Sequence, residues 1–408
     1  MEGNINQLLV QAQTAYDADD WSSLIQYLQQ LILVEDNQHS ETVNSELLLK
    51  LALPVLEMGD FQQRWEIAKV LVRLGNIAIA PLIDILEDED AEEELRWYAA
   101  RTLGEFQHPD AIASLVELLK TSEDEELKGI AATALGQMGS DAIAALSELL
   151  QSEDTRLLAV RSLAYIRRQE TITPLLSVVQ DTQVVVRATA LEALSSFHDQ
   201  RIPPVLLQAL DDVAATVRRV AVLGLGFRPD LNSELNLVVR LQTKLYDFNV
   251  EVCCAAAISL ARMGDDHAAT YLYQVLISLH TPTILQLEII RALIWVGTVS
   301  GLEYLQKVIE QSTSETVWQE IVTVLGRVEK PQLTPKATEI LLELLRLHHP
   351  AIEIANIKSA IALSLGQLGS QQAIIPLTTL MKDSNEQVKL HAIAALKKLS
   401  PEFVPIES

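Results

Sequence analysis

The chain has 408 residues, of which 49% are hydrophobic, only 5% are aromatic, and two are cysteines. Its net charge of −24 excludes nucleic-acid binding as a main role, because binding phosphates needs a basic surface. The two adjacent cysteines exclude a disulfide scaffold and indicate a reducing compartment. We predict a cytoplasmic protein with no membrane span, because charges interrupt every long apolar stretch and no signal sequence is recognisable.

Residues 1–63 are predicted to be helical, in three helices near 4–16, 21–33 and 45–58 with a polar link at 39–42. They lack the repeated phrase that marks the rest of the chain. We interpret 1–63 as a helical cap that closes one end of a repeat array, since such arrays need caps. The alternative is a separate module that docks a partner.

From residue 64 to residue 400 one sequence motif recurs. It consists of a helix, a turn marked by glycine and a second helix, as in 127–150. A leucine anchors each first helix, and successive anchors lie 28 to 40 residues apart. The anchors are Leu71, Leu103, Leu135, Leu163, Leu194, Leu225, Leu260, Leu293, Leu325, Leu365 and Leu396. This period predicts an all-α superhelix, a solenoid of about eleven helix pairs, followed by a tail at 401–408.

Two further features keep a fixed distance from the anchor. Glycines end several anchor helices, at Gly75, Gly139, Gly264, Gly297 and Gly369. A base stands seven residues before most anchors, as at Arg187, and an aspartate stands thirteen before several, as at Asp181. This constant register predicts a ladder of ion pairs from repeat to repeat. The acid runs at 87–94 and 123–126 are interpreted as solvated turns.

The segments VVVRATALEAL (184–194), TVRRVAVLGLG (216–226) and KDSNEQVKLHAIAAL (382–396) resemble HEAT repeats. The short period and the phrases AIAPL and AIIPL resemble the HEAT-like subset found in phycobilisome lyases and related cyanobacterial proteins. The resemblance implies an α-solenoid in which the anchor helices line the concave surface. It implies no single function, because one fold serves many tasks.

The sequence contains no motif for catalysis: no glycine-rich phosphate loop, GxSxG or HExxH occurs. We therefore expect a protein that is not an enzyme, has no cofactor and has no metal site. Cys253 and Cys254 begin an anchor helix, where a helix N-terminus lowers a thiol pKa and would favour a reactive or metal-binding thiolate. The preferred interpretation is that both are small buried residues.

Positions six and two before the anchor, and two after it, share a face that carries no core residue. Bases and aromatic residues gather there although acids dominate the chain. We call the following set the groove residues: Trp65, Trp97, Arg101, Arg161, Tyr165, Arg219, Phe227, Arg262, Arg291, Trp295 and Arg327. Arginine and aromatic side chains are enriched at binding hot spots, so they predict a groove that captures a protein. The alternative is that they cover seams between helices.

The leading hypothesis is a non-catalytic scaffold or adaptor that binds a protein partner with an acidic contact surface. By resemblance, the first alternative is a phycobilin lyase or bilin-handling subunit, in which arginines would pair with bilin propionates. The second alternative is a partner of an iron–sulfur carrier, similar to a cyanobacterial HEAT protein associated with such carriers, and it would give Cys253 and Cys254 a role.

Overall fold

A computed structural model describes residues 2–38 and 45–400. These residues form α-helices and short 3-10 helices, with no strand among them, so the predicted all-α repeat fold is confirmed. The chain divides into two compact units, Met1–Phe197 and His198–Ser408. The predicted tail at 401–408 and the predicted link at 39–42 lie outside the described residues.

The first unit contains helices α1 to α12. Their bounds are α1 Glu2–Asp17, α2 Trp21–Gln38, α3 Ser45–Met58, α4 Phe61–Leu74, α5 Ile79–Glu87, α6 Glu93–Leu103, α7 Pro109–Thr121, α8 Glu125–Gln137, α9 Ile143–Leu149, α10 Glu153–Ile166, α11 Ile172–Leu176 and α12 Val184–Leu194. Three 3-10 turns join them, at Gly75–Ala78, Gly139–Ala142 and Gln169–Thr171.

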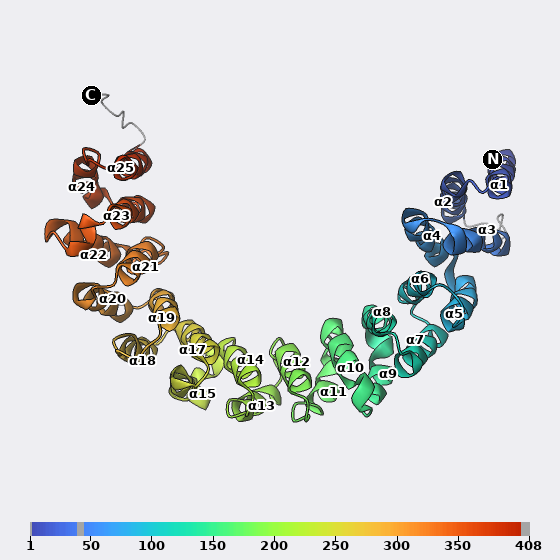
Figure 1. Cartoon of the computed structure of the whole chain (residues 1–408), viewed down its shortest axis with the longest axis horizontal. Helices are drawn as coiled ribbons and strands as arrows, with labels where there is room; N and C mark the ends of the chain where they lie inside the picture. The colour runs from blue at the N-terminus through green and yellow to red at the C-terminus, as the bar shows by residue number, and fades with distance from the viewer. Residues whose placement is uncertain (1, 39–44, 401–408) are drawn as a thin grey trace. The chain divides into compact units, whose positions relative to one another are not determined.

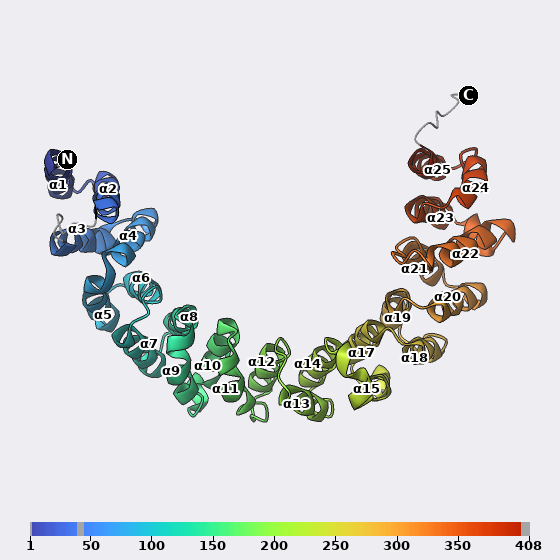
Figure 2. The same ribbon diagram turned by 180° about the vertical axis from the view of Figure 1, so that it is seen from behind.

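The anchor leucines of this unit lie on α4, α6, α8, α10 and α12, and each of these helices contacts the next. We call them the anchor row. The remaining repeat helices, α5, α7, α9 and α11, form a return row behind it, and each packs against the anchor helix that follows. Within this unit the anchor row lies on the inner side of the bend (Figures 1 and 2). Helices α2 and α3, from the predicted cap, both pack on α4, and the division at residue 63 stays a prediction.

The second unit repeats this arrangement with helices α13 to α25. Their bounds are α13 Ile202–Ala209, α14 Ala215–Gly226, α15 Asn232–Leu235, α16 Leu237–Gln242, α17 Val250–Met263, α18 Asp266–Leu276, α19 Thr283–Val296, α20 Val299–Gln311, α21 Glu315–Leu325, α22 Thr334–Arg346, α23 Ala355–Leu368, α24 Ile374–Leu380 and α25 Glu386–Leu399. The anchor row is α14, α17, α19, α21, α23 and α25, each in contact with the next. Four 3-10 turns lie at Pro229–Leu231, Thr243–Tyr246, Pro350–Glu353 and Gln371–Ala373.

The anchor leucines form the centre of the core. All eleven have a relative exposure of 0%, except Leu396 at 1%. The glycines predicted to end anchor helices all have positive φ, between 64° at Gly264 and 74° at Gly75. A positive φ, which glycine adopts without strain, ends the helical path there and turns the chain towards the next return helix.

The predicted ladder is present as ion pairs between neighbouring repeats. Arg156 pairs with Asp181 at 2.8 Å, Arg218 with Asp247 at 2.7 Å, and Lys358 with Asp383 at 3.0 Å. In the first repeat Glu92 and Glu94 replace the aspartate, each 3.1 Å from Arg64. Arg187 donates to the carbonyl oxygens of Asp181 and Thr182. Lys128 and Lys389 depart from the ladder, because each pairs with a glutamate three residues earlier in its own helix.

Candidate functional site: the anchor row

In the first unit the structure brings three groove residues together. Trp65 lies on α4, and Trp97 and Arg101 lie one helical turn apart on α6. The guanidinium carbon of Arg101 is 3.7 Å from the centre of the Trp65 ring and 5.9 Å from that of Trp97. Such stacking fixes the guanidinium plane through cation–π attraction and ring contact.

Arg101 also lines a pocket of about 360 Å³ between α4 and α6. Trp65, Lys69 and Arg73 contribute to its wall, and Glu105 is the acid among the lining residues. Lys69 pairs with Glu66 at 2.9 Å. Arg101 makes no hydrogen bond and no ion pair with any described residue. Its N–H donors are therefore held in place and are available to a carboxylate.

Arg161 and Tyr165 lie farther along the same row, on α10. Both are exposed, and 63% of the Tyr165 side chain faces solvent. A Cβ atom on Gly136 of α8 would stand 3.2 Å from the Tyr165 ring, so the missing side chain lets the ring lie against α8. This ring and Arg161 do not touch the Trp65–Arg101 cluster in any contact that the structure records.

In the second unit, some of the groove arginines form ion pairs with carboxylates and others do not. The guanidinium of Arg262 stacks on Phe227, 4.3 Å from the ring centre. Arg291 pairs with Glu320 at 2.6 Å and with Glu288 at 3.4 Å, and Arg219 lies 3.9 Å from Glu251. These acids reduce the positive charge that the sequence predicts for this part of the groove.

Aromatic surface is nevertheless prominent on this row. Trp295 is 62% exposed and Phe227 is 57% exposed, and Arg327 is exposed without an ion pair to any described residue. An open pocket of about 670 Å³ lies between Arg219 and Arg291, with Leu223, Ile258 and Leu287 in its wall. The row thus offers apolar contact area beside arginines, which is the composition of a protein interface.

Residues 79–156 and 151–226 match the sequence family of HEAT repeats. Residues 79–226 therefore match HEAT repeats. The match is to HEAT repeats in general and includes the anchor row from α6 to α14. Comparison with curated proteins gave no match.

Known structures share the fold at low sequence identity. Kap121p is similar with a TM-score of 0.59 and 12% identity over 97% of this chain and 51% of its own. Kap95p, solved with RanGDP, has a TM-score of 0.56 and 12% identity over 98% of this chain and 62% of its own. An AP-3 complex model has a TM-score of 0.53 and 13% identity over 98% of this chain and 83% of its own. This chain therefore spans about half to three fifths of the two Kap proteins.

Both cysteines lie in α17, close to the groove. Cys253 is 4% exposed, and its thiol donates to the carbonyl oxygen of Asp247 at 3.2 Å. Burial raises the pKa of the Cys253 thiol, and burial with the nearby charge of Glu288 raises the pKa of Cys254 to about 11. Both groups are thus protonated near neutral pH, which argues against reactive thiolates. Cys253 is buried as predicted, whereas Cys254 is only half-buried.

Within residues 2–38 and 45–400, no cluster of three or more histidine, cysteine or acidic side chains is arranged as metal ligands. Among the helices of 2–38 and 45–400, none has the length and apolar composition needed to cross a membrane.

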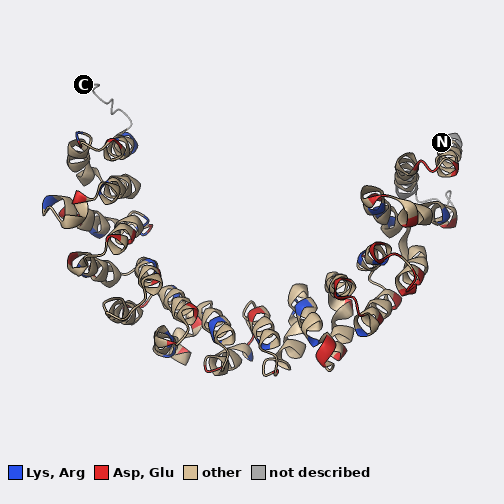
Figure 3. Ribbon diagram, in the orientation of Figure 1, with Lys and Arg blue, Asp and Glu red and all other residues tan. Residues whose placement is uncertain are grey.

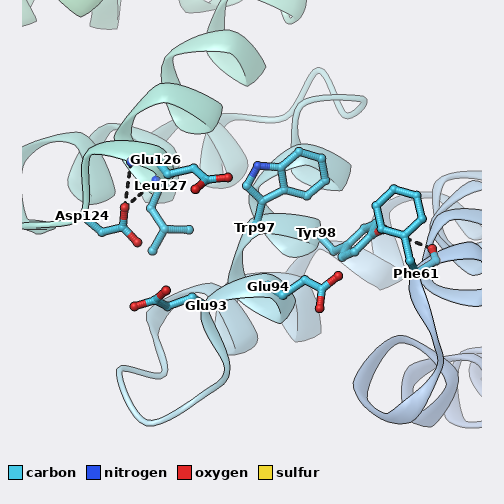
Figure 4. Close-up of a pocket in the computed structure, with 8 residues that line it drawn as sticks. All are labelled: Phe61, Glu93, Glu94, Trp97, Tyr98, Asp124, Glu126 and Leu127. Carbon is cyan, nitrogen blue, oxygen red and sulfur yellow. Dashed lines mark hydrogen bonds between the residues drawn. The ribbon is translucent and has the colours of Figure 1, made fainter.

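An acidic pocket beside the groove was not predicted from the sequence. The runs 87–94 and 123–126 were expected to be solvated turns, and Figure 3 shows acidic positions around the turn between α5 and α6. Glu93, Glu94, Asp124 and Glu126, from these runs, line a pocket of about 340 Å³ with three aromatic residues (Figure 4). The available signal was that Glu94 and Glu126 both stand nine residues before an anchor, next to the groove face.

Proposed function

We propose that the protein is a non-catalytic scaffold that captures a partner protein on its anchor row. The observation that carries this proposal is Arg101, whose guanidinium stacks on Trp65 at 3.7 Å and has free donors in a pocket. An arginine that is already fixed loses less entropy on binding. Its guanidinium group can donate two parallel hydrogen bonds to one carboxylate. The partner therefore presents an acidic side chain to this pocket.

Exposed aromatic rings support the same proposal at other points of the row. Tyr165, Phe227 and Trp295 each leave more than half of their side chains in solvent. Large apolar rings beside arginines are the residues that dominate binding energy in protein interfaces. Among the structural neighbours, Kap95p shares this fold and binds RanGDP, so a fold of this kind can serve to bind a protein.

The proposal is tested by co-purification from the organism that encodes the protein. Arg101→Glu with Arg161→Glu reverses two cations of the anchor row in the first unit. We expect the recovery of partner protein to fall about fivefold or more, since two engaged charge contacts are worth about 1 kcal/mol or more together. Circular dichroism should show unchanged helicity, because both side chains lie outside the core.

The matched control is Lys50→Glu with Lys120→Glu, which changes the net charge by the same amount. Lys50 lies on α3 and Lys120 on α7, neither of which belongs to the anchor row, and both side chains are exposed. Partner recovery should stay near that of the unchanged protein. Loss of the partner in the control and retention in the anchor-row variant would contradict the proposal.

Bilin handling is the alternative that the same pocket supports. An arginine could pair with a propionate of the tetrapyrrole while Trp65 or Trp97 packs on a ring. Recovery of phycobiliprotein subunits in the co-purification, with a change in the visible absorption of added phycocyanobilin that is lost in Arg101→Glu, would favour this alternative. Recovery of a small iron–sulfur carrier would favour the other alternative, for which Cys253 and Cys254 offer no reactive thiolate.

A further inference from the structure

The acidic pocket opens beside the Arg101 pocket and shares helix α6 with it. Its aromatic wall consists of the exposed ring of Phe61 and the half-buried ring of Trp97, together with Tyr98, which is fully buried (Figure 4). The Trp97 and Tyr98 rings meet edge to face, with centres 5.1 Å apart. The Tyr98 hydroxyl donates to the carbonyl oxygen of Phe61 at 3.1 Å, which fixes this wall to α4.

The four carboxylates around this wall are mostly without cations. Glu94 pairs with Arg64. Asp124 caps α8 by accepting from the backbone N–H groups of Glu126 and Leu127. Glu93 and Glu126 are exposed and make no side-chain ion pair with any described residue. The first turns of α6 and α8 offset part of this negative charge, but no side-chain cation lines the pocket.

Helix capping explains why acids stand at these helix starts, but it does not explain why a hollow with the accessible rings of Phe61 and Trp97 lies between them. An aromatic face next to carboxylates is the environment that an ammonium or guanidinium group prefers, through cation–π attraction and ion pairing together. A pocket of about 340 Å³ has room for the end of one lysine or arginine side chain.

We propose that this pocket binds a lysine or arginine side chain of the partner protein, next to the acidic side chain held by Arg101. The proposal rests on the proposed scaffold function and specifies its partner. Glu94 and Arg101 are seven residues apart on α6, which is about 10 Å along the helix axis. An extended segment covers that distance in about three residues. The recognised segment therefore carries one basic and one acidic residue about three positions apart.

The test uses the indole N–H signals of the five tryptophans in the full-length protein, recorded by NMR. Trp97→Phe and Trp65→Phe assign the two signals that report on the two pockets. The cationic probe is N-acetyl-arginine methylamide, and the neutral citrulline analogue is its control. We expect the arginine probe to shift the Trp97 signal in a saturable way and the citrulline probe to shift it far less.

Two variants with the same change in charge decide whether the carboxylates are responsible. Glu93→Gln with Glu126→Gln should weaken the apparent affinity for the arginine probe about fivefold, since each pair contributes about 0.5 kcal/mol. Glu123→Gln with Glu125→Gln removes two neighbouring acids that do not line the pocket, and should leave the affinity unchanged. A Trp97 signal that ignores the arginine probe, or an equal response in both variants, would overturn the proposal.

A second probe separates this proposal from the scaffold function on which it rests. N-acetyl-glutamate methylamide should shift the Trp65 signal, and Arg101→Gln should abolish that shift. If the glutamate probe has no effect on Trp65 while the arginine probe still acts on Trp97, the Arg101 pocket fails and the acidic pocket stands. If only the glutamate probe acts, the acidic pocket fails and the Arg101 pocket stands.

Discussion

Arginine has two distinct roles in this protein, set by its distance from the anchor leucine. Arg218, seven residues before Leu225, donates through Nε and Nη2 to both carboxylate oxygens of Asp247, each at 2.7 Å. Arg101, two residues before Leu103, stacks on Trp65 and leaves its donors free. The first arginine joins two repeats, and the second is available for binding.

The Arg218–Asp247 pair predicts a stability that depends on pH. The side chains are only 14% and 7% exposed, and the hydrogen bonds from Arg218 lower the pKa of Asp247 below its usual 3.8. The pair therefore stabilises the fold fully well above pH 3.8, and this contribution is lost as the pH falls through the lowered pKa. Asp247→Asn should cost about 2–3 kcal/mol at pH 7 by urea unfolding, and clearly less at pH 3.

An exposed pair of the same kind serves as the control for this prediction. Arg228 and Asp230 lie 2.9 Å apart, but 55% of the Asp230 side chain faces solvent. Asp230→Asn should change the urea midpoint much less than Asp247→Asn does at pH 7. A cost for Asp247→Asn that is the same at pH 7 and pH 3 would mean that its charge does not stabilise the stack.

At the scale of the helix, neighbouring anchor helices approach closely at small residues. Ser259 on α17 is fully buried, and its hydroxyl donates to the carbonyl oxygen of Val222 on α14 at 2.9 Å. The same bond joins Ser162 to Ala132 and Ser364 to Val322. In each case a serine directly before the anchor bonds to the preceding anchor helix, so close contact is part of the repeat.

Gly226→Ala tests this close approach between α14 and α17. A Cβ atom at Gly226 would lie 2.7 Å from the Ser259 Cβ and 3.0 Å from its Cα, so the helices would have to separate. We expect a loss of about 1–3 kcal/mol in the free energy of unfolding, measured with urea.

For Gly129→Ala in α8 we expect the opposite change in the free energy of unfolding. A Cβ atom there would meet nothing within 4 Å. Alanine should stabilise the protein by about 0.5–1 kcal/mol, because glycine is a poor residue inside a helix. Equal effects of the two substitutions would show that helix propensity, and not helix packing, decides the outcome at both positions.

The helices and their order were predictable because burial recurs with a fixed period. Each anchor such as Leu135 must be buried between neighbouring repeats, so its spacing fixes the repeat wherever it occurs. The stacking of Arg101 on Trp65 was not predictable, because it joins residues of two helices whose packing distance the sequence does not state. The pairing of Arg291 with Glu320 was missed for the same reason.

The acidic pocket was even less predictable from the sequence, because it combines residues of three helices. It takes Phe61 from the start of α4, Trp97 from α6 and Glu126 from α8. Each residue has an ordinary explanation in its own helix, as a surface ring or as an acid in a first turn. Only the packing of three successive anchor helices places them around one hollow, and a pattern within one repeat cannot reveal it.

The whole chain has a net charge of −24, but the anchor row carries local positive charge at defined places such as Arg101. Docking depends on the local field and not on the total charge, so a strongly acidic protein can still hold an acidic side chain at Arg101. The adjacent acidic pocket then selects against partners that carry acid alone. Two neighbouring pockets of opposite charge thus give specificity that a uniformly charged row would lack.

The central claim is that the anchor row, and not the return row, is the surface that binds the partner. A photo-crosslinking residue, p-benzoylphenylalanine, at Tyr165 replaces an exposed ring of the anchor row, and the same residue at Glu117 on α7 probes the return row. After irradiation in cells of the encoding organism, we predict a discrete crosslinked partner from position 165, lost when Arg101→Glu and Arg161→Glu are added, and none from position 117. A partner crosslinked from position 117 and not from position 165 would contradict the account.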